Sequence, residues 1–170
     1  MPAYRRYYSD VDQTLFLTLV TAGRSPWLAS EAAKRQVLDA LRATKALHRF
    51  RHHGHVLLDD HLHLLISVKV GKNIPRIVGS FKQASLARLV SLPEIFGERV
   101  WQRRYYDHII RDEVDFSRHL DYLHYNPVKH GLVSLARNWK WSSLSAWQAC
   151  GAYPSDWGQT EPDSIRHMTE

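Results

Sequence analysis

The arrangement of strands depends most on residues 55–68, which read His-Val-Leu-Leu-Asp-Asp-His-Leu-His-Leu-Leu-Ile-Ser-Val. Two apolar runs flank the pair Asp59-Asp60, so this stretch predicts two strands that form an antiparallel pair. Side chains two residues apart on a strand point to the same face. His61 and His63 should therefore project together, while the leucines that alternate with them point into the core.

The remaining elements follow from apolar periodicity and from residues typical of helix starts. In order, we expect a strand over 14–21, a helix of about 19 residues after Ser30, strands over 55–58 and 61–68, a helix over 74–91, an extended segment over 100–110 and a helix after Asp112. This order predicts an α+β, ferredoxin-like (RRM-like) fold, an antiparallel sheet with helices on one face. Residues 1–150 should form the domain, and the polar residues 151–170 a loosely held tail.

Composition narrows the class of protein. With 170 residues, 44% of them hydrophobic, the chain suits one domain with a proper core. No apolar run approaches the roughly 18 residues that a membrane span needs. The single cysteine, Cys150, excludes an internal disulfide framework and fits a reducing compartment. We therefore expect a cytoplasmic, nucleoid-associated protein with no membrane partner.

The charge points to a polyanionic partner. Lysine and arginine outnumber aspartate and glutamate by 23 to 17, which gives a net charge of +6 with neutral histidines. A mildly basic surface without such a partner would have the same composition. However, Arg5 and Arg6, and again Arg103 and Arg104, stand beside aromatic residues. Cations pair with phosphates and flat rings stack on unpaired bases, so these segments favour single-stranded nucleic acid.

The two histidines of the second predicted strand are candidate metal ligands. Neutral imidazoles at this spacing can share a divalent ion and leave positions for a substrate oxygen and one more protein ligand. Nitrogen ligands suit Mn²⁺, whereas Mg²⁺ prefers oxygen, and the sequence leaves both ions open. The alternative is that His61 and His63 simply lie on a solvent-exposed face, which is common in a chain with 11 histidines.

The last predicted helix carries a tyrosine and an amide. Arg118, Tyr122 and Asn126 are four residues apart and stack along one face, with Lys129 close to it. Pro127 removes a backbone hydrogen bond and disfavours helical angles at the preceding residue, so the helix should kink or end at Asn126. That break could turn the amide toward the metal as a third ligand. Taken alone, the segment also fits a core tyrosine and a helix-ending asparagine.

Tyr122 is the candidate nucleophile, and Tyr125 the alternative. A phenol with a pKa near 10 attacks poorly at neutral pH unless its phenolate is stabilised, for which Arg118, Lys129 and the metal are candidates. Attack on a DNA phosphate would leave a 5′-phosphotyrosine and a free 3′-OH. A second 3′-OH could then reverse the step without ATP, which suits strand transfer better than hydrolysis.

Several segments resemble the REP-associated tyrosine transposases, bacterial relatives of the single-strand transposases in the HUH endonuclease group. The resemblance covers roughly residues 4–158 in the same order and is most specific in His119-Leu-Asp-Tyr-Leu-His-Tyr-Asn-Pro-Val-Lys-His-Gly-Leu-Val133. The other matching segments are Tyr4-Arg-Arg-Tyr-Tyr8, Asp60-His-Leu-His63, Trp101-Gln-Arg-Arg104, Ile110-Arg-Asp-Glu113, Trp139-Lys-Trp-Ser-Ser143 and Tyr153-Pro-Ser-Asp-Trp157.

The resemblance implies an HUH-type ferredoxin-like fold and metal-dependent cleavage and rejoining of single-stranded DNA at REP hairpins. It assigns the two histidine ligands, the third ligand and the nucleophile to His61, His63, Asn126 and Tyr122. It also implies a monomer, and it places Arg5 and Arg6 against the hairpin, as their charge does.

Two other functions use some of the same residues. The first is a non-catalytic module that binds hairpins through the same sheet, but drift would be expected to remove at least one member of the site, and all four are present. The second is a metal-dependent phosphohydrolase that acts through water. It would leave Tyr122 unused, and the sequence shows no cluster of carboxylates suited to two metals.

Overall fold

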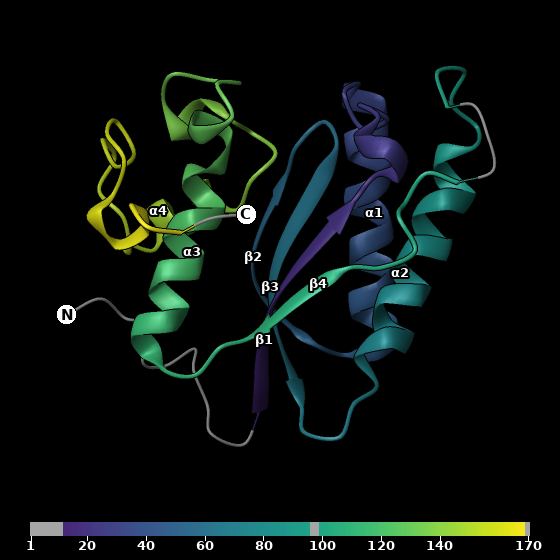
Figure 1. Ribbon diagram of the computed structural model, residues 1–170, viewed down its shortest axis with the longest axis horizontal. Helices are drawn as coiled ribbons and strands as arrows, with labels where there is room; N and C mark the ends of the chain where they lie inside the picture. The colour runs from purple at the N-terminus through teal and green to yellow at the C-terminus, as the bar shows by residue number, and fades with distance from the viewer. Residues whose placement is uncertain (1–11, 96–98, 169–170) are drawn as a thin grey trace.

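The computed structural model describes residues 12–95 and 99–168. Within them, one sheet is formed by β1 (Asp12–Val20), β2 (Arg51–Leu57), β3 (His61–Lys69) and β4 (Tyr106–Ile109). The strands lie in the order β2-β3-β1-β4, and each neighbouring pair is antiparallel (Figure 1). The predicted ferredoxin-like α+β fold is confirmed.

The predicted hairpin is formed by β2 and β3. The backbone N–H of Leu58 donates to the carbonyl of His61 at 2.9 Å across the Asp59-Asp60 turn. All of β3 except its last residue is buried, because β1 and β2 flank it and other elements cover both of its faces. As predicted, Leu62 and Leu64 face the opposite side of the sheet from His61 and His63.

Two helices, α1 (Glu31–His48) and α2 (Ile74–Leu89), cover one face of the sheet (Figure 1). Each begins at a polar side chain that accepts a hydrogen bond from the first turn, Ser30 for α1 and Asn73 for α2. The core beneath them joins apolar residues of both helices to the alternate leucines of the strands, including Leu17, Leu19, Val37, Leu62, Leu64 and Phe81.

A third helix, α3 (Glu113–Lys129), packs against the opposite face (Figure 1). It begins, as predicted, at Asp112, whose side chain accepts a hydrogen bond from the backbone N–H of Asp115 at 2.8 Å. Its apolar residues bury with those of β1, β2 and β3 in a second core that includes Phe16, Val56, Leu65, Phe116, Leu120 and Leu123. The expected placement of helices on one face therefore holds for α1 and α2, whereas α3 adds a third layer because the second face is also apolar.

Of the two outcomes predicted at Asn126, a kink or an end of the helix, the end is wrong. The helix α3 continues to Lys129 with Pro127 inside it, and the backbone N–H of His130 donates to the carbonyl of Asn126 at 3.0 Å. Pro127 forfeits only one backbone bond, near the end of the helix. Its burial with Asn126 against the sheet offsets that loss.

The C-terminal residues lie along α3. After η3 (Ala136–Asn138) and α4 (Leu144–Ala149), the chain returns to α3 and ends in η4 (Asp163–Ile165). Tyr153 and Ser164 each donate a hydrogen bond of 2.7 Å to the Asp121 carboxylate, and Ile165 is buried. These two hydrogen bonds lower the pKa of Asp121, but burial has the larger effect and raises it. The division at residue 150 into domain and tail stays a prediction.

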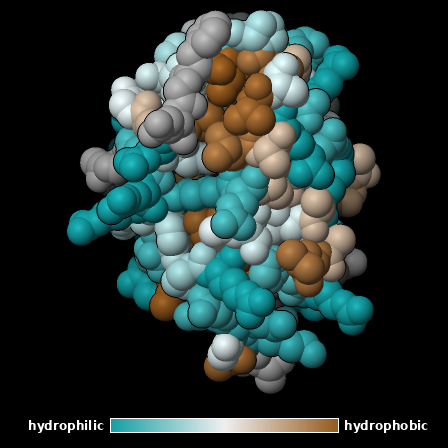
Figure 2. Space-filling view, turned by 90° about the vertical axis from the view of Figure 1, so that its right-hand side faces the viewer, coloured by the Kyte–Doolittle hydropathy of each residue, from teal (hydrophilic) through white to brown (hydrophobic). Residues whose placement is uncertain are grey.

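The outer surface of the α2 side is mainly hydrophilic, with one larger hydrophobic patch and several smaller ones (Figure 2). Val90, just beyond α2, is 58% exposed. Among the described residues, none of the helices combines the length and the apolar character that crossing a bilayer requires.

Four histidines that are buried or half-buried predict that acid weakens the fold. Burial lowers the pKa of His52 and His53 to about 4, and that of His55 and His124 to about 3. Because the ordinary value is 6.5, the unfolded chain takes up protons that the folded chain refuses as the pH falls below that value. Each histidine then costs up to about 1.4 kcal/mol of stability per pH unit. We expect the urea midpoint to be lower at pH 5 than at pH 7.5.

His124→Gln removes one of these groups and should make the pH dependence of the urea midpoint shallower. His167→Gln changes an exposed histidine and should leave that dependence as it is. Equal midpoints at both pH values in the wild-type protein would contradict the prediction.

Candidate active site

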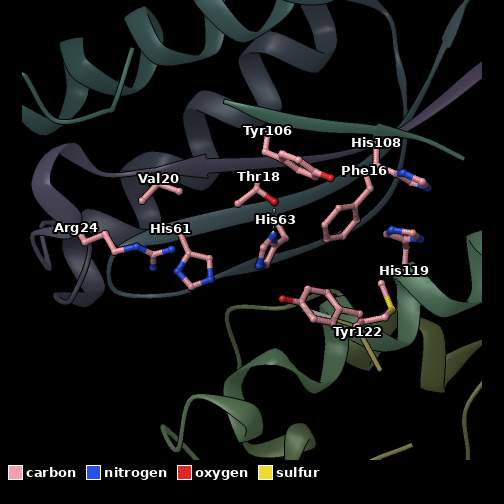
Figure 3. Close-up of a pocket in the computed structure, with 11 residues that line it drawn as sticks. Phe16, Thr18, Val20, Arg24, His61, His63, Tyr106, His108, His119 and Tyr122 are labelled. Atoms are coloured by element: carbon pink, nitrogen blue, oxygen red, sulfur yellow. Dashed lines mark hydrogen bonds between the residues drawn. The ribbon is translucent and has the colours of Figure 1, made fainter. Parts of the chain in front are cut away.

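A cavity of about 360 Å³ lies between the second face of the sheet and α3. Its walls come from alternate residues of three strands, from α3 and from two flanking segments (Figure 3). The lining residues are Phe16, Thr18, Val20, Arg24, His61, His63, Tyr106, His108, His119, Tyr122 and Met168.

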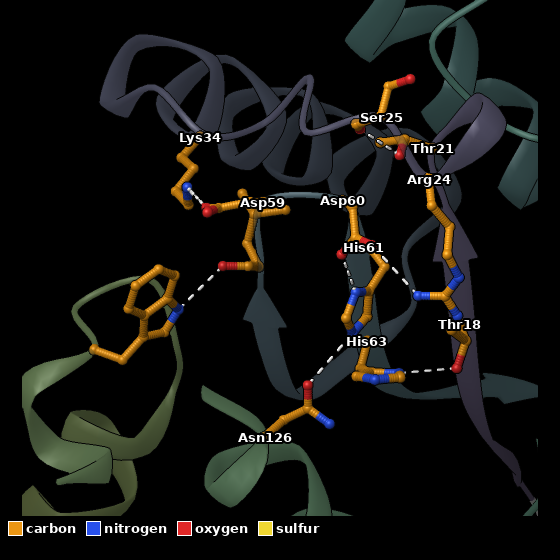
Figure 4. Close-up of polar contacts among 12 residues, drawn as sticks. Thr18, Thr21, Arg24, Ser25, Lys34, Asp59, Asp60, His61, His63 and Asn126 are labelled. Carbon is orange, nitrogen blue, oxygen red and sulfur yellow. Dashed lines mark hydrogen bonds and ion pairs between the residues drawn. The ribbon is translucent and has the colours of Figure 1, made fainter. Parts of the chain in front are cut away.

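The two predicted ligand histidines lie at the base of this cavity. His61 and His63 are 2% and 3% exposed, so the alternative of a solvent-exposed face is wrong. Their rings meet edge to face with centroids 4.8 Å apart. Asp60 Oδ1 lies 2.6 Å from Nδ1 of His61, and Thr18 Oγ1 lies 2.8 Å from Nδ1 of His63 (Figure 4). Hydrogen-bond partners at Nδ1 fix the orientation of each ring and leave its Nε2 atom available to bind a metal ion.

Asn126, the predicted third ligand, reaches the same place from α3. It is fully buried, and its Oδ1 atom lies 3.3 Å from Nε2 of His61 (Figure 4). In the tautomer of His61 that carries its proton on Nδ1, toward Asp60, Nε2 of His61 and the amide oxygen of Asn126 present lone pairs to the same point. Nε2 of His63 is buried and has no hydrogen-bond partner among the described residues. A buried polar atom without a hydrogen-bond partner lowers the stability of a fold by about 1–3 kcal/mol, and a bound cation would offset this loss.

The electrostatics of the histidines suit metal binding. Burial holds the pKa of His63 well below its usual range, and the neighbouring His61, His130 and Lys129 lower it further. The imidazole therefore stays neutral at physiological pH, the form in which it binds a metal. Burial opposes ionisation of Asp60, but its contacts with His61 and Arg24 lower the net pKa, so it is an anion that orients His61. Two imidazoles and one amide oxygen fit a divalent transition ion such as Mn²⁺.

Tyr122 faces the histidines across the cavity. It is 3% exposed, yet its phenol lines the cavity and its oxygen points toward His63 (Figure 3). Its ring lies edge-on to His63 and to Phe16, with centroids 5.5 and 6.0 Å away. The ammonium group of Lys129 lies 4.7 Å from the centroid of the phenol ring. The cation over the ring favours the phenolate form of the phenol.

Two other residues of α3 lie outside the cavity lining. Arg118 is exposed. Steps of four residues each rotate about 40° around a helix, so the row from Arg118 to Asn126 drifts by about 80° and only its later members face the sheet. Tyr125 packs beneath Gly158 in the second core, and burial raises its pKa.

The remaining candidate DNA contacts lie on the surface or outside the described residues. Arg103 and Arg104 are exposed just before β4, where their backbone carbonyls accept hydrogen bonds from Lys82. Arg5 and Arg6 lie outside the described residues.

His108, Asp115 and His119 form a second polar cluster in the same cavity, with ligand atoms within 4.8 Å of one another. These are residue types that a metal accepts. However, the two imidazoles stack at 4.4 Å with planes 14° apart, so their in-plane lone pairs run side by side and do not converge. Both rings and the backbone N–H of Arg111 already contact the Asp115 carboxylate. As it stands, the cluster is a hydrogen-bonded network.

The cavity residues with polar roles that were missed from the sequence include Thr18, Arg24 and His119. Thr18 lies on β1 opposite His63, and only the pairing register could reveal it. Arg24 follows Gly23 in the segment that breaks the strand, where the sequence signals a turn but not its direction. His119 belongs to the family-like motif but precedes the residues to which that motif assigns a role.

A phenol that faces paired imidazoles across a cavity on an antiparallel sheet is the arrangement expected of an enzyme that attacks phosphodiesters with a tyrosine. The family model described as "Transposase IS200 like" matches residues 12–126, which span the sheet and reach the last proposed ligand. The chain therefore belongs to this transposase family.

Relatives within the family carry the more specific name. A Haemophilus influenzae protein provisionally named a REP-associated tyrosine transposase is 35% identical over 113 residues, 60% of this chain and 63% of that protein, less than two thirds of its length. The REP-associated tyrosine transposase of Escherichia coli is 28% identical over 158 residues, 92% of this chain and 91% of that protein. A solved structure of a REP-associated tyrosine transposase bound to a REP hairpin covers both chains fully, with a TM-score of 0.75 and 27% identity. The resemblance noted from the sequence is confirmed.

Mn²⁺ binding tests the ligand set directly. Thr18→Val keeps the shape of the side chain but removes the hydrogen bond to Nδ1 of His63, so we expect Mn²⁺ to bind at least about 10-fold more weakly in calorimetry. Thr14→Val is the matched control, because Thr14 lies on the same strand but bonds Ser67 away from the cavity. Unchanged Mn²⁺ affinity in Thr18→Val, or loss of affinity in both variants, would contradict the assignment.

Proposed function

We propose that this protein cleaves and rejoins single-stranded DNA at REP-type hairpins through a 5′-phosphotyrosine formed on Tyr122. The observation that carries the proposal is the direction of the phenol oxygen toward His63, beside the convergent atoms of His61 and Asn126. The relative solved with a REP hairpin supports the choice of DNA.

Each step can be assigned to residues of this chain. His61, His63 and Asn126 would hold the cation, Mg²⁺ or Mn²⁺, which polarises a non-bridging oxygen of the scissile phosphate when bound. Tyr122 attacks the phosphorus atom and displaces the 3′ oxygen. Lys129 above the ring favours loss of the phenol proton. Attack by a 3′-OH on the phosphotyrosine reverses the reaction and joins a new strand.

The surface cations would hold the rest of the DNA. Arg103, Arg104 and Arg118 are exposed, and Arg5 and Arg6 are assigned to the hairpin by resemblance and charge. Nucleophile and ligands come from a single chain, so we propose that the protein acts as a monomer, with its substrate placing it at the nucleoid.

A covalent adduct on a denaturing gel tests this function. Wild-type protein incubated with labelled REP-hairpin DNA and Mn²⁺ should give a protein–DNA band, and Tyr122→Phe should abolish that band while leaving hairpin affinity unchanged. Tyr125→Phe is the matched control, since it removes the neighbouring phenol of α3 that lies outside the cavity lining.

The other outcomes separate the competing functions. DNA cleavage without an adduct would indicate hydrolysis by water, and hairpin binding without cleavage would indicate a binding module. An adduct that persists in Tyr122→Phe and disappears in Tyr125→Phe would move the nucleophile to Tyr125.

A further inference from the structure

The turn after β1 has an unusual backbone. In η2 (Ala22–Arg24), two consecutive residues adopt left-handed angles, Gly23 with φ of 62° and Arg24 with φ of 52°. Glycine adopts this region without penalty, but arginine seldom does. Such strain persists only where the surroundings enforce it, and it is found preferentially at functional sites.

Hydrogen bonds fix this turn against the hairpin that carries the histidines. The backbone N–H of Thr21 donates to the carbonyl of Asp60 at 2.8 Å, and that of Ala22 to the carbonyl of Val100 at 2.7 Å. The hydroxyl of Thr21 donates to the carbonyl of Ser25 at 2.7 Å (Figure 4). The fold therefore fixes the point at which the Arg24 side chain leaves the backbone, at the edge of the cavity.

The turn aims Arg24 into the cavity. The Nη1 atom of its guanidinium lies 3.3 Å from Oδ2 of Asp60. The other carboxylate oxygen of Asp60, Oδ1, contacts His61 (Figure 4). The side chain is 54% exposed, and an exposed ion pair of this kind contributes only about 0–1 kcal/mol. The strained turn thereby places a cation at the cavity wall, where it can meet a bound anion as well as Asp60.

Arg24 and Tyr122 lie at opposite ends of the row of ligands. Tyr122 contacts Phe16 and His63, which stand near the middle of the strands. His61 lies one step further along, opposite Val20, and Arg24 lies beyond the end of β1. Figure 3 shows the same sequence from the phenol past the two imidazoles to the guanidinium. A phosphate held at the histidines would have the phenol on one side and Arg24 on the other.

We propose that Arg24 is a catalytic residue that stabilises the leaving 3′ oxygen of the DNA strand, an inference that rests on the proposed function. In an in-line displacement, the leaving oxygen departs on the side opposite the nucleophile. Attack by Tyr122 therefore sends that oxygen toward Arg24. A guanidinium stays protonated at all relevant pH values and offers several N–H donors to a developing anion.

Apart from the DNA strand and Tyr122, the step needs no reactant except water. The Oη–P bond of Tyr122 forms while the P–O3′ bond breaks, and the electron pair of that bond goes to O3′. The phenol proton leaves to solvent, and O3′ takes a proton from water. Arg24 donates hydrogen bonds to O3′ as its charge grows and keeps its own protons. In rejoining, the same contacts favour the deprotonated form of the attacking 3′-OH.

A merely positioning role, in which Arg24 acts through Asp60 on His61, makes a different prediction. A DNA substrate with sulfur in place of the 3′ bridging oxygen distinguishes the positioning role of Arg24 from the catalytic role. A thiolate leaves readily without stabilisation, because a thiol is far more acidic than an alcohol. Arg24→Ala should therefore slow adduct formation about 100-fold or more on the oxygen substrate and by less than about 3-fold on the sulfur substrate, with Mn²⁺ affinity unchanged.

Arg35→Ala is the matched control, because Arg35 also forms a 3.3 Å exposed ion pair, with Glu31, but on α1 outside the cavity lining. It should react like wild type on both substrates. Equal slowing of Arg24→Ala on oxygen and sulfur, or no slowing on oxygen, would overturn the proposal and leave Arg24 a positioning or a surface residue. Failure of the proposed function looks different, since wild type would then form no adduct on either substrate.

Discussion

The antiparallel pairing of β1 with β3 is the constraint on which the site depends. In this register Thr18 lies opposite His63, and Val20 opposite His61. Because side chains alternate along a strand, a slip of one residue would turn both imidazoles toward α1 and α2. The apolar face of β3 excludes that slip, since Leu62, Leu64 and Ile66 are buried in the core beneath those two helices. Hydrophobic burial on one face of the sheet thereby fixes the chemistry on the other.

The helix α3 positions the site residues on the opposite wall of the cavity. Tyr122 and Asn126 are four residues apart, so one rigid turn separates the proposed nucleophile from the proposed third ligand. Phe116, Leu120 and Leu123 bury against the sheet and hold that turn in place. Continuation of the helix past Asn126 matters here, because an ordered turn positions the amide more rigidly than a frayed end would.

Rules that act along the chain predicted most of this architecture. The strands, the caps at Ser30 and Asp112 and the shared face of the two histidines all follow from spacing and local chemistry. The sequence could not show that burial would carry α3 through Pro127, because a local rule was overridden by tertiary packing. Thr18 and Arg24 were missed for a related reason. Their roles arise from pairing and turn geometry between segments far apart in the sequence, which no local pattern records.

The charge balance of the cavity explains why these residue types occur together. Two imidazoles and an amide are neutral ligands, so they would leave the full charge of a divalent cation available to a phosphate. Carboxylate ligands would cancel part of that charge, and in this structure the nearest carboxylate, Asp60, contacts the nitrogen of His61 on the side away from the ligand position. Asp60 is balanced in turn by Arg24, while Lys129 lies over the phenol. In the reaction proposed for this site, cations would therefore stand at both ends of the phosphodiester as it gains negative charge, Lys129 beside the attacking phenol and Arg24 beside the leaving oxygen.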